Sequence, residues 1–160
     1  MERNNRMLNI VLFRPEIPQN TGNIGRTCVL TNSRLHIVGP MGFTISDKTV
    51  TRAGLDYWKD LDIHIYGSFE ELREKYTGKR FFFSSTKGKR YHSDVTFQDE
   101  DFIVFGRESS GLPEYIMEEN RSNLFRVPMV DTTTRSLNLS NTVAIVAYEA
   151  LRQIGFPHMK

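Results

Sequence analysis

The chain has 160 residues, a formal net charge of +2 and one cysteine. This length suits a single domain, since domains typically hold roughly 100 to 150 residues and can form one core without disulfides. Cys28 has no cysteine with which to pair inside the chain, so we expect a reduced, cytoplasmic protein. No run of about 18 apolar residues is present to span a bilayer, and residues 1–10 lack the apolar stretch of a secretory signal, so we expect no membrane partner.

The basic residues are concentrated in two segments. Residues 1–34 hold five arginines and two glutamates, and residues 79–92 hold five lysines or arginines and no acid, whereas residues 99–119 hold seven acids and one arginine. If the two basic segments met in the fold, they would offer a surface for nucleic-acid phosphates. The alternative is an ordinary solvated surface, and charge alone favours that interpretation.

Short apolar runs alternate with amphipathic segments along the chain. The runs predict strands over residues 8–13, 35–38, 62–66, 80–84, 102–105 and 124–127. A helix is expected over residues 20–32, with Asn20 or Thr21 as its N-cap. Ser68 and Glu71 form a capping-box pattern before a second helix, and apolar residues at helical spacing predict a third over residues 139–154.

This alternation predicts an α/β fold, with a mostly parallel sheet and helices on both faces. Residues 1–160 contain no linker, internal repeat or low-complexity tract, so one domain is expected. Ligands of such sheets bind beyond the carboxyl ends of the strands. The loops after Ser84, Phe105 and Val127 are therefore the candidate binding loops.

Several familiar sites lack their sequence motifs. The four histidines occur singly, without a CxxC or HExxH pattern, so no metal site is expected. The first strand is followed by RPEIPQN and not by GxGxxG, and no Gly-Lys-Ser/Thr sequence is present. The sequence therefore predicts neither nicotinamide nor ATP chemistry.

Two polar segments follow predicted strands. In NTGNIGR, residues 20–26, Asn23 and Arg26 lie on one helical face, and a guanidinium suits a phosphate oxygen pair. The alternative is a capped helix start with a solvated arginine, which this segment taken alone favours. In FGRESSGLP, residues 105–113, Gly106 and Gly111 permit close backbone approaches, and an ordinary connector explains the segment equally well.

The third polar segment, TRSLNLSN at residues 134–141, is less ordinary. Ser136, Asn138, Ser140 and Asn141 place four short polar side chains around the start of an apolar helix. One suffices as a helix cap, so the others need a ligand, a second chain or buried backbone groups as partners. A solvated helix start is the alternative, and we favour a functional role.

Together the three segments resemble the three motifs of the SpoU branch of the SPOUT superfamily. The motifs are NxGNxxR at residues 20–26, FGxExxGLP at 105–113 and RSLNLSN at 135–141. RPEIPQNTGNIGR at 14–26, PMGF at 40–43, AGLDYW at 53–58 and STKG at 85–88 are further similar to single-domain members that methylate the wobble nucleotide of tRNA. The resemblance covers nearly the whole chain.

The resemblance implies an enzyme that moves a methyl group from S-adenosylmethionine to the ribose 2′-hydroxyl of a wobble cytidine or modified uridine in tRNA. It also implies a carboxyl-terminal trefoil knot and a homodimer. The expected cofactor-binding residues are Ser84, Gly106, Val127, Ser136 and Leu137. A 2′-hydroxyl target requires RNA, because DNA lacks that group.

By position in the motifs, Arg26 is the family's catalytic arginine, expected to orient the ribose or its phosphate. Asn138, together with Ser136, is expected to bond near the attacking oxygen, and Asn20 is expected to contact RNA beside Arg26. Two other functions stay open. One is a catalytically inert RNA-binding module of the same fold, and the other is a small-molecule α/β enzyme, which the residues indicate without the resemblance.

The last predicted helix is the expected dimer interface. Ala144 and Leu151 lie off its main apolar face, with Tyr148 between them, so a second face is available to a partner. The resemblance implies that Arg26 of one chain works with Ser136 of the other.

Overall fold

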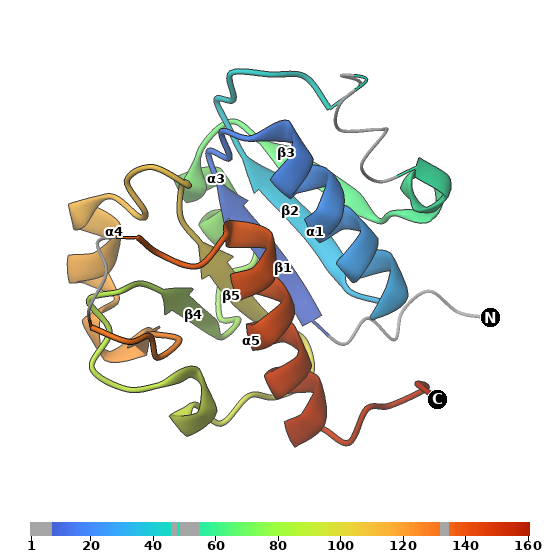
Figure 1. Ribbon diagram of the computed structural model, residues 1–160. Helices are drawn as coiled ribbons and strands as arrows, with labels where there is room; N and C mark the ends of the chain where they lie inside the picture. Colours follow the sequence, from blue (N-terminus) through green and yellow to red (C-terminus); the bar gives the residue numbers. More distant parts are fainter. Residues whose placement is uncertain (1–7, 46–47, 49–54, 132–134) are drawn as a thin grey trace.

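The computed structural model describes residues 8–45, 48, 55–131 and 135–160. Within them, six strands form one sheet in the order β3-β2-β1-β5-β4-β6, and every pairing between neighbours is parallel (Figure 1). The predicted mostly parallel α/β sheet is thus confirmed. The strands are β1 Leu8–Phe13, β2 Arg34–Val38, β3 Ile63–Tyr66, β4 Phe81–Ser84, β5 Asp101–Phe105 and β6 Leu124–Phe125. The α-helices are α1 Pro18–Leu30, α3 Phe69–Lys75, α4 Glu114–Glu119 and α5 Leu139–Gln153.

Helices cover both faces of the sheet, because side chains alternate along each strand. On β1, Leu8, Ile10 and Leu12 belong to the core beneath α1 and α5. Val11 and Phe13 belong to a second core beneath α3 and α4. Figure 1 shows α1 and α5 side by side over the first face, and these two helices contact each other.

Strand β6 is shorter than the predicted residues 124–127. After Phe125 the chain leaves β4 and pairs with the segment that follows β4: the Arg126 N–H donates to the Arg90 carbonyl at 2.9 Å, and the His92 N–H donates to the Arg126 carbonyl at 2.8 Å. Gly88 makes this contact possible, because a Cβ there would lie under 3.0 Å from three backbone atoms of Phe125. The segment after β4 therefore lies directly against β6.

Helix α5 forms as predicted, with Asn138 as its N-cap and with its end at Gln153. One detail of the prediction was wrong. Leu151 was expected off the core face, yet it is fully buried, because it lies one helical turn beyond buried Ala147. Tyr148 and Ile145 are the large apolar side chains that α5 leaves exposed.

The start of α1 also differs from the prediction. The helix begins at Pro18 with Ile17 as its N-cap, two residues before Asn20, and Ile17 has no capping side chain. Proline suits this position because the first helical N–H groups have no partner within the helix. A carboxylate from a distant loop binds the backbone just before the helix: Glu108 accepts from the Glu16 N–H at 2.8 Å and from the Ile17 N–H at 2.7 Å.

The contact is reciprocal. Ser109 donates its N–H to the Glu16 carboxylate at 2.9 Å and its hydroxyl to the same carboxylate at 2.8 Å. These hydrogen bonds hold the pKa of Glu16 below its ordinary value. Asn20 Nδ2 donates to Glu108 at 3.3 Å. We call this set of residues the Glu16–Glu108 clamp; it fixes the start of α1 to the loop after β5.

The loop after β5 is closed by its own backbone. Arg107 and Gly111 exchange N–H to carbonyl bonds of 3.2 and 2.9 Å, and Gly111 has a φ of 66°, a conformation that favours glycine. A Cβ at Gly106 would lie under 3.0 Å from backbone atoms of Gly111 and Leu112. The loop can therefore close only over a glycine.

We predict that Gly106→Ala lowers the free energy of unfolding by about 1 to 3 kcal/mol, because neither colliding backbone can move freely. Gly42→Ala is the matched control, since a Cβ there meets no atom within 4 Å. Denaturant unfolding of both variants tests this expectation. Equal midpoints for the two would show that the close approach is not a constraint.

We predict that Glu108→Gln destabilises the protein by about 1 kcal/mol, because an amide has one acceptor oxygen where the carboxylate has two for the N–H groups of Glu16 and Ile17. Hydrogen exchange should accelerate at the amides of residues 16–21. Glu118→Gln, at an exposed carboxylate 3.9 Å from Arg121, should change neither quantity. Unchanged exchange at residues 16–21 in the Glu108 variant would mean that the carboxylate does not fix the start of α1.

Candidate active site

A cavity of about 780 Å³ opens at the carboxyl ends of β4 and β5. Most of its wall comes from four parts of the chain: residues 84–87 at the end of β4, residues 105–112 at the end of β5, residues 135–139 before and at the start of α5, and the first turn of α1. Glu114 and Met117 of α4 and Thr142 of α5 complete the wall. The sheet has a topological switch point between β1 and β5, and open parallel sheets bind ligands at such points. The cavity thus lies where the predicted binding loops meet.

Six residues singled out from the sequence share this cavity. They come from all four wall segments, and they are Asn20, Ser84, Gly106, Ser136, Leu137 and Asn138. Leu137 is 39% exposed, so it offers an apolar surface to the cavity. Asn20 is mostly buried, and its amide already donates to Glu108.

Two other candidates lie elsewhere. Val127 is half-buried, packs against the core beneath α1 and α5, and is not part of the cavity wall. Arg26 is exposed, and its guanidinium lies 4.9 Å from the centre of the Tyr57 ring. Arg26 is six residues beyond Asn20 on α1, which is roughly 9 Å along the helix axis. A single chain therefore does not place Arg26 in its own cavity.

Among the four short polar side chains at the start of α5, Asn138 is the N-cap. Asn138 Oδ1 accepts from the Ser140 N–H at 2.9 Å, from the Ser140 hydroxyl at 2.6 Å and from the Asn141 N–H at 3.4 Å. Asn138 Nδ2 and the Ser136 hydroxyl make no hydrogen bond with the described residues. Ser136 and Asn138 both line the cavity, so both groups are available to a ligand.

The wall carries charges of both signs. Arg107, Arg135 and Lys87 supply cations, and Glu108 and Glu114 supply carboxylates. Arg107 is held by a 3.2 Å bond from its Nε to the Gly111 carbonyl. A cavity with this mixture and an apolar patch suits a ligand that has both an anionic and a cationic group besides an apolar ring.

Other chemistries find little support in the part of the chain that the structure describes. Within residues 8–45, 48, 55–131 and 135–160, no group of three His, Cys, Asp or Glu side chains could hold a metal ion. Burial raises the pKa of the Cys28 thiol to about 12, so it is not a nucleophile at neutral pH. No described helix is both long and apolar enough to cross a membrane.

Sequence reasoning missed the residues that hold the site together. Glu16, Glu108 and Ser109 bond across more than 90 positions, and no local pattern announces such a partnership. Glu108 stands in the FGxExxGLP motif and Glu16 in the RPEIPQN stretch, which were the only signals. Ala53 and Gly54 of the AGLDYW stretch and Thr134 of the third polar segment lie outside the described residues.

Comparisons with known proteins agree with this geometry. The pattern of the SpoU rRNA Methylase family matches residues 7–148. The tRNA (cytidine(34)-2′-O)-methyltransferase of Escherichia coli (strain K12) is 47% identical over 152 residues, which are 94% of this chain and 96% of that protein. A solved structure described as "Structural insights into the 2-OH methylation of C/U34 on tRNA" is 40% identical, with a TM-score of 0.88 over 94% of this chain and 97% of that chain.

An AdoMet-bound rRNA methyltransferase from Sinorhizobium meliloti is 22% identical, with a TM-score of 0.83 over 96% of this chain and 59% of that one, and so shares the fold. The family pattern spans all three polar segments and most of the chain. The chain belongs to the SpoU rRNA methylase family.

Proposed function

We propose that this protein transfers a methyl group from S-adenosylmethionine to the ribose 2′-hydroxyl of nucleotide 34, the wobble nucleotide, of tRNA. The observation that carries the proposal is the single cavity built from all three family motifs, with Asn20, Gly106 and Ser136 in its wall. Near-identical length and 47% identity to a tRNA (cytidine(34)-2′-O)-methyltransferase support the choice of substrate.

The residues present fit this cofactor. The volume of about 780 Å³ lies in the range of roughly 300 to 1,000 Å³ that small-molecule sites occupy. Leu137 and the backbone at Gly106 and Ser84 would hold the adenosine, and the carboxylates of Glu108 and Glu114 are suited to the positive charges of the methionine end. Arg107 and Arg135 are suited to its carboxylate.

S-adenosylmethionine supplies an electrophilic methyl group when bound. The protein's part is alignment, which can contribute up to roughly 7 to 11 kcal/mol toward the barrier. Ser136 and the free Nδ2 of Asn138 would bond near the attacking 2′-oxygen. A guanidinium stays protonated in proteins, so Arg26 would orient a phosphate or stabilise negative charge on the oxygen instead of acting as a base.

We further propose a homodimer in which Arg26 serves the cavity of the partner. Arg26 lies outside its own cavity, which supports this arrangement. Helices α1 and α5 lie together on one face, and they expose Leu30, Ile145 and Tyr148. Such a surface suits a partner with the same apolar character.

We also propose that the chain forms a carboxyl-terminal trefoil knot. The close packing of Gly88 against the Phe125 backbone and the hydrogen bonds from residues 90–92 to Arg126 support it, since they interlock the segment after β4 with the chain that leads to α5.

The proposed reaction is tested by incubating the protein with labelled S-adenosylmethionine and tRNA lacking modification at position 34. Mass spectrometry of a digest should place one 2′-O-methyl group on nucleotide 34. An inert RNA-binding module or a small-molecule enzyme of the same fold predicts tRNA without label. A tRNA methylated only at another nucleotide would show that the substrate is assigned wrongly.

We predict that Arg26→Ala reduces methyl transfer at least about 100-fold while S-adenosylmethionine affinity stays within a few fold. The reason is that Arg26 lies outside the cavity of its own chain. Single-turnover kinetics measure the rate of methyl transfer, and calorimetric titration of the same preparation measures the S-adenosylmethionine affinity. Equal losses of affinity and turnover would place Arg26 in the cofactor site.

A mixed dimer gives a second prediction. Leu137→Asp should abolish cofactor binding alone, because it puts a charge on the apolar part of the wall. When this variant is unfolded and refolded together with Arg26→Ala, the mixed dimer holds one intact site and should regain about a quarter of wild-type activity at equal amounts. Each variant refolded alone is the control. A mixture as inactive as its components would mean that each chain supplies its own arginine.

A further inference from the structure

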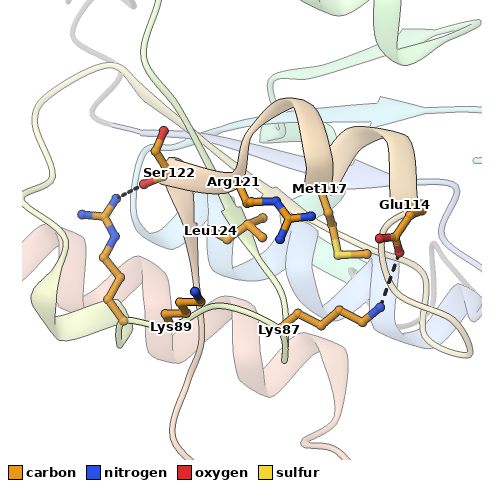
Figure 2. Close-up of a pocket in the computed structure, with 8 residues that line it drawn as sticks. Lys87, Lys89, Glu114, Met117, Arg121, Ser122 and Leu124 are labelled. Carbon is orange, nitrogen blue, oxygen red and sulfur yellow. Dashed lines mark hydrogen bonds and ion pairs between the residues drawn. The ribbon is translucent and has the colours of Figure 1, made fainter.

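A second cavity adjoins the first and is lined mainly by cations. Its volume is about 460 Å³, and Lys87, Glu114 and Met117 belong to the walls of both cavities. Figure 2 shows Lys87 and Lys89 on one side of it, and Glu114, Met117 and Arg121 on the other. The floor is apolar, since Met117 and Leu124 are both largely buried.

The cations of this cavity are incompletely neutralised. Lys89 makes no ion pair or side-chain hydrogen bond with the described residues. Lys87 reaches Glu114 at 3.4 Å and Arg121 reaches Glu118 at 3.9 Å, but all four side chains are more than half exposed, so both pairs are weak. An added anion can therefore compete with Glu114 and Glu118.

Arg90 supplies an independent sign of a missing partner. Its Nη2 donates to the Ser122 carbonyl at 3.1 Å, which fixes the guanidinium in the wall. Its Nε is buried and has no hydrogen-bond partner among the described residues. Buried polar atoms without partners are rare, and this one belongs to a residue of the cavity wall, so an oxygen acceptor brought by a ligand would complete its hydrogen bonding.

We propose that this basic cavity binds phosphate groups of the tRNA strand on either side of the methylated nucleotide. The inference rests on the proposed function and extends it, by assigning the backbone-binding surface beside the cofactor cavity. The shared wall at Lys87 brings a strand that enters one cavity to the edge of the other. Lys and Arg side chains on a rigid wall position RNA without reading its bases.

The test compares the double variant Lys89→Ala/Arg121→Ala with Lys75→Ala/Lys79→Ala, which removes the same charge around the α3–β4 connection, outside both cavities. All four side chains are exposed, so both proteins should fold. The cavity variant should bind tRNA about tenfold more weakly, and the slope of log affinity against log salt should fall by about 1 to 2. The tRNA affinity of the control variant should match that of wild type within twofold. The S-adenosylmethionine affinity of both variants should also stay within twofold of wild type. Lys89→Arg/Arg121→Lys should restore tRNA affinity.

Wild-type affinity and slope in the cavity variant, or an equal loss in the control, would overturn the proposal. Weaker binding of inorganic phosphate with unchanged tRNA affinity would overturn it too, by assigning the cavity to a small anion. Methylation of nucleotide 34 by wild-type protein is scored separately. A wild type that binds tRNA through the cavity but transfers no methyl group would leave this inference standing and reject the proposed reaction.

Discussion

The site depends on the hydrogen bonds of two carboxylates, Glu16 and Glu108, which join the segment after β1 to the loop after β5. Helix α1 starts without a capping side chain of its own. Glu108, from the loop after β5, accepts from the N–H groups of Glu16 and Ile17 just before the helix, and Glu16 returns the interaction by accepting from Ser109. Because the start of α1 and that loop both line the cavity, the clamp sets the distance between two of its walls.

Close backbone approaches shape the other walls. Gly106 lies against the backbone of Gly111 and Leu112, and Gly88 lies against that of Phe125. Neither contact could form with a side chain at the glycine. These approaches bring the ends of β4, β5 and β6 close enough for short loops to enclose a ligand. Small residues recur in these segments because backbones meet there, and the backbone N–H and C=O groups become available to the cofactor.

Local patterns in the sequence predict most of the fold. Each of the six apolar runs forms a strand, and Ser68 caps its helix as its spacing with Glu71 indicates. The errors arise where the partner is distant in sequence. The sequence predicts the start of α1 at Asn20 or Thr21, but the helix begins at Pro18, and the carboxylate that fixes this start, Glu108, lies about 90 residues away. Strand β6 ends early because Arg126 pairs with residues 90–92.

The sequence likewise predicts one part of the candidate site and not another. The rule that parallel sheets bind ligands at their carboxyl ends predicted the loops that carry Ser84, Gly106 and Ser136. It could not predict that Arg26 lies outside the cavity wall of its own chain, because that depends on how α1 is placed against the other walls. The basic residues of segment 79–92 also have different roles, which their charge alone does not reveal. Arg80 pairs with Asp101, whereas Lys87, Lys89 and Arg90 line the second cavity.

We propose that the loops at residues 84–88, 105–112 and 135–142 form one cofactor cavity together with the start of α1. Hydrogen exchange in the presence and absence of S-adenosylhomocysteine, the demethylated product, tests it most directly. We expect slower exchange in residues 84–88, 105–112 and 135–142 together, with Leu137 and its neighbours changing most. Protection confined to the walls of the second cavity, or in only one of the three loops, would contradict the claim.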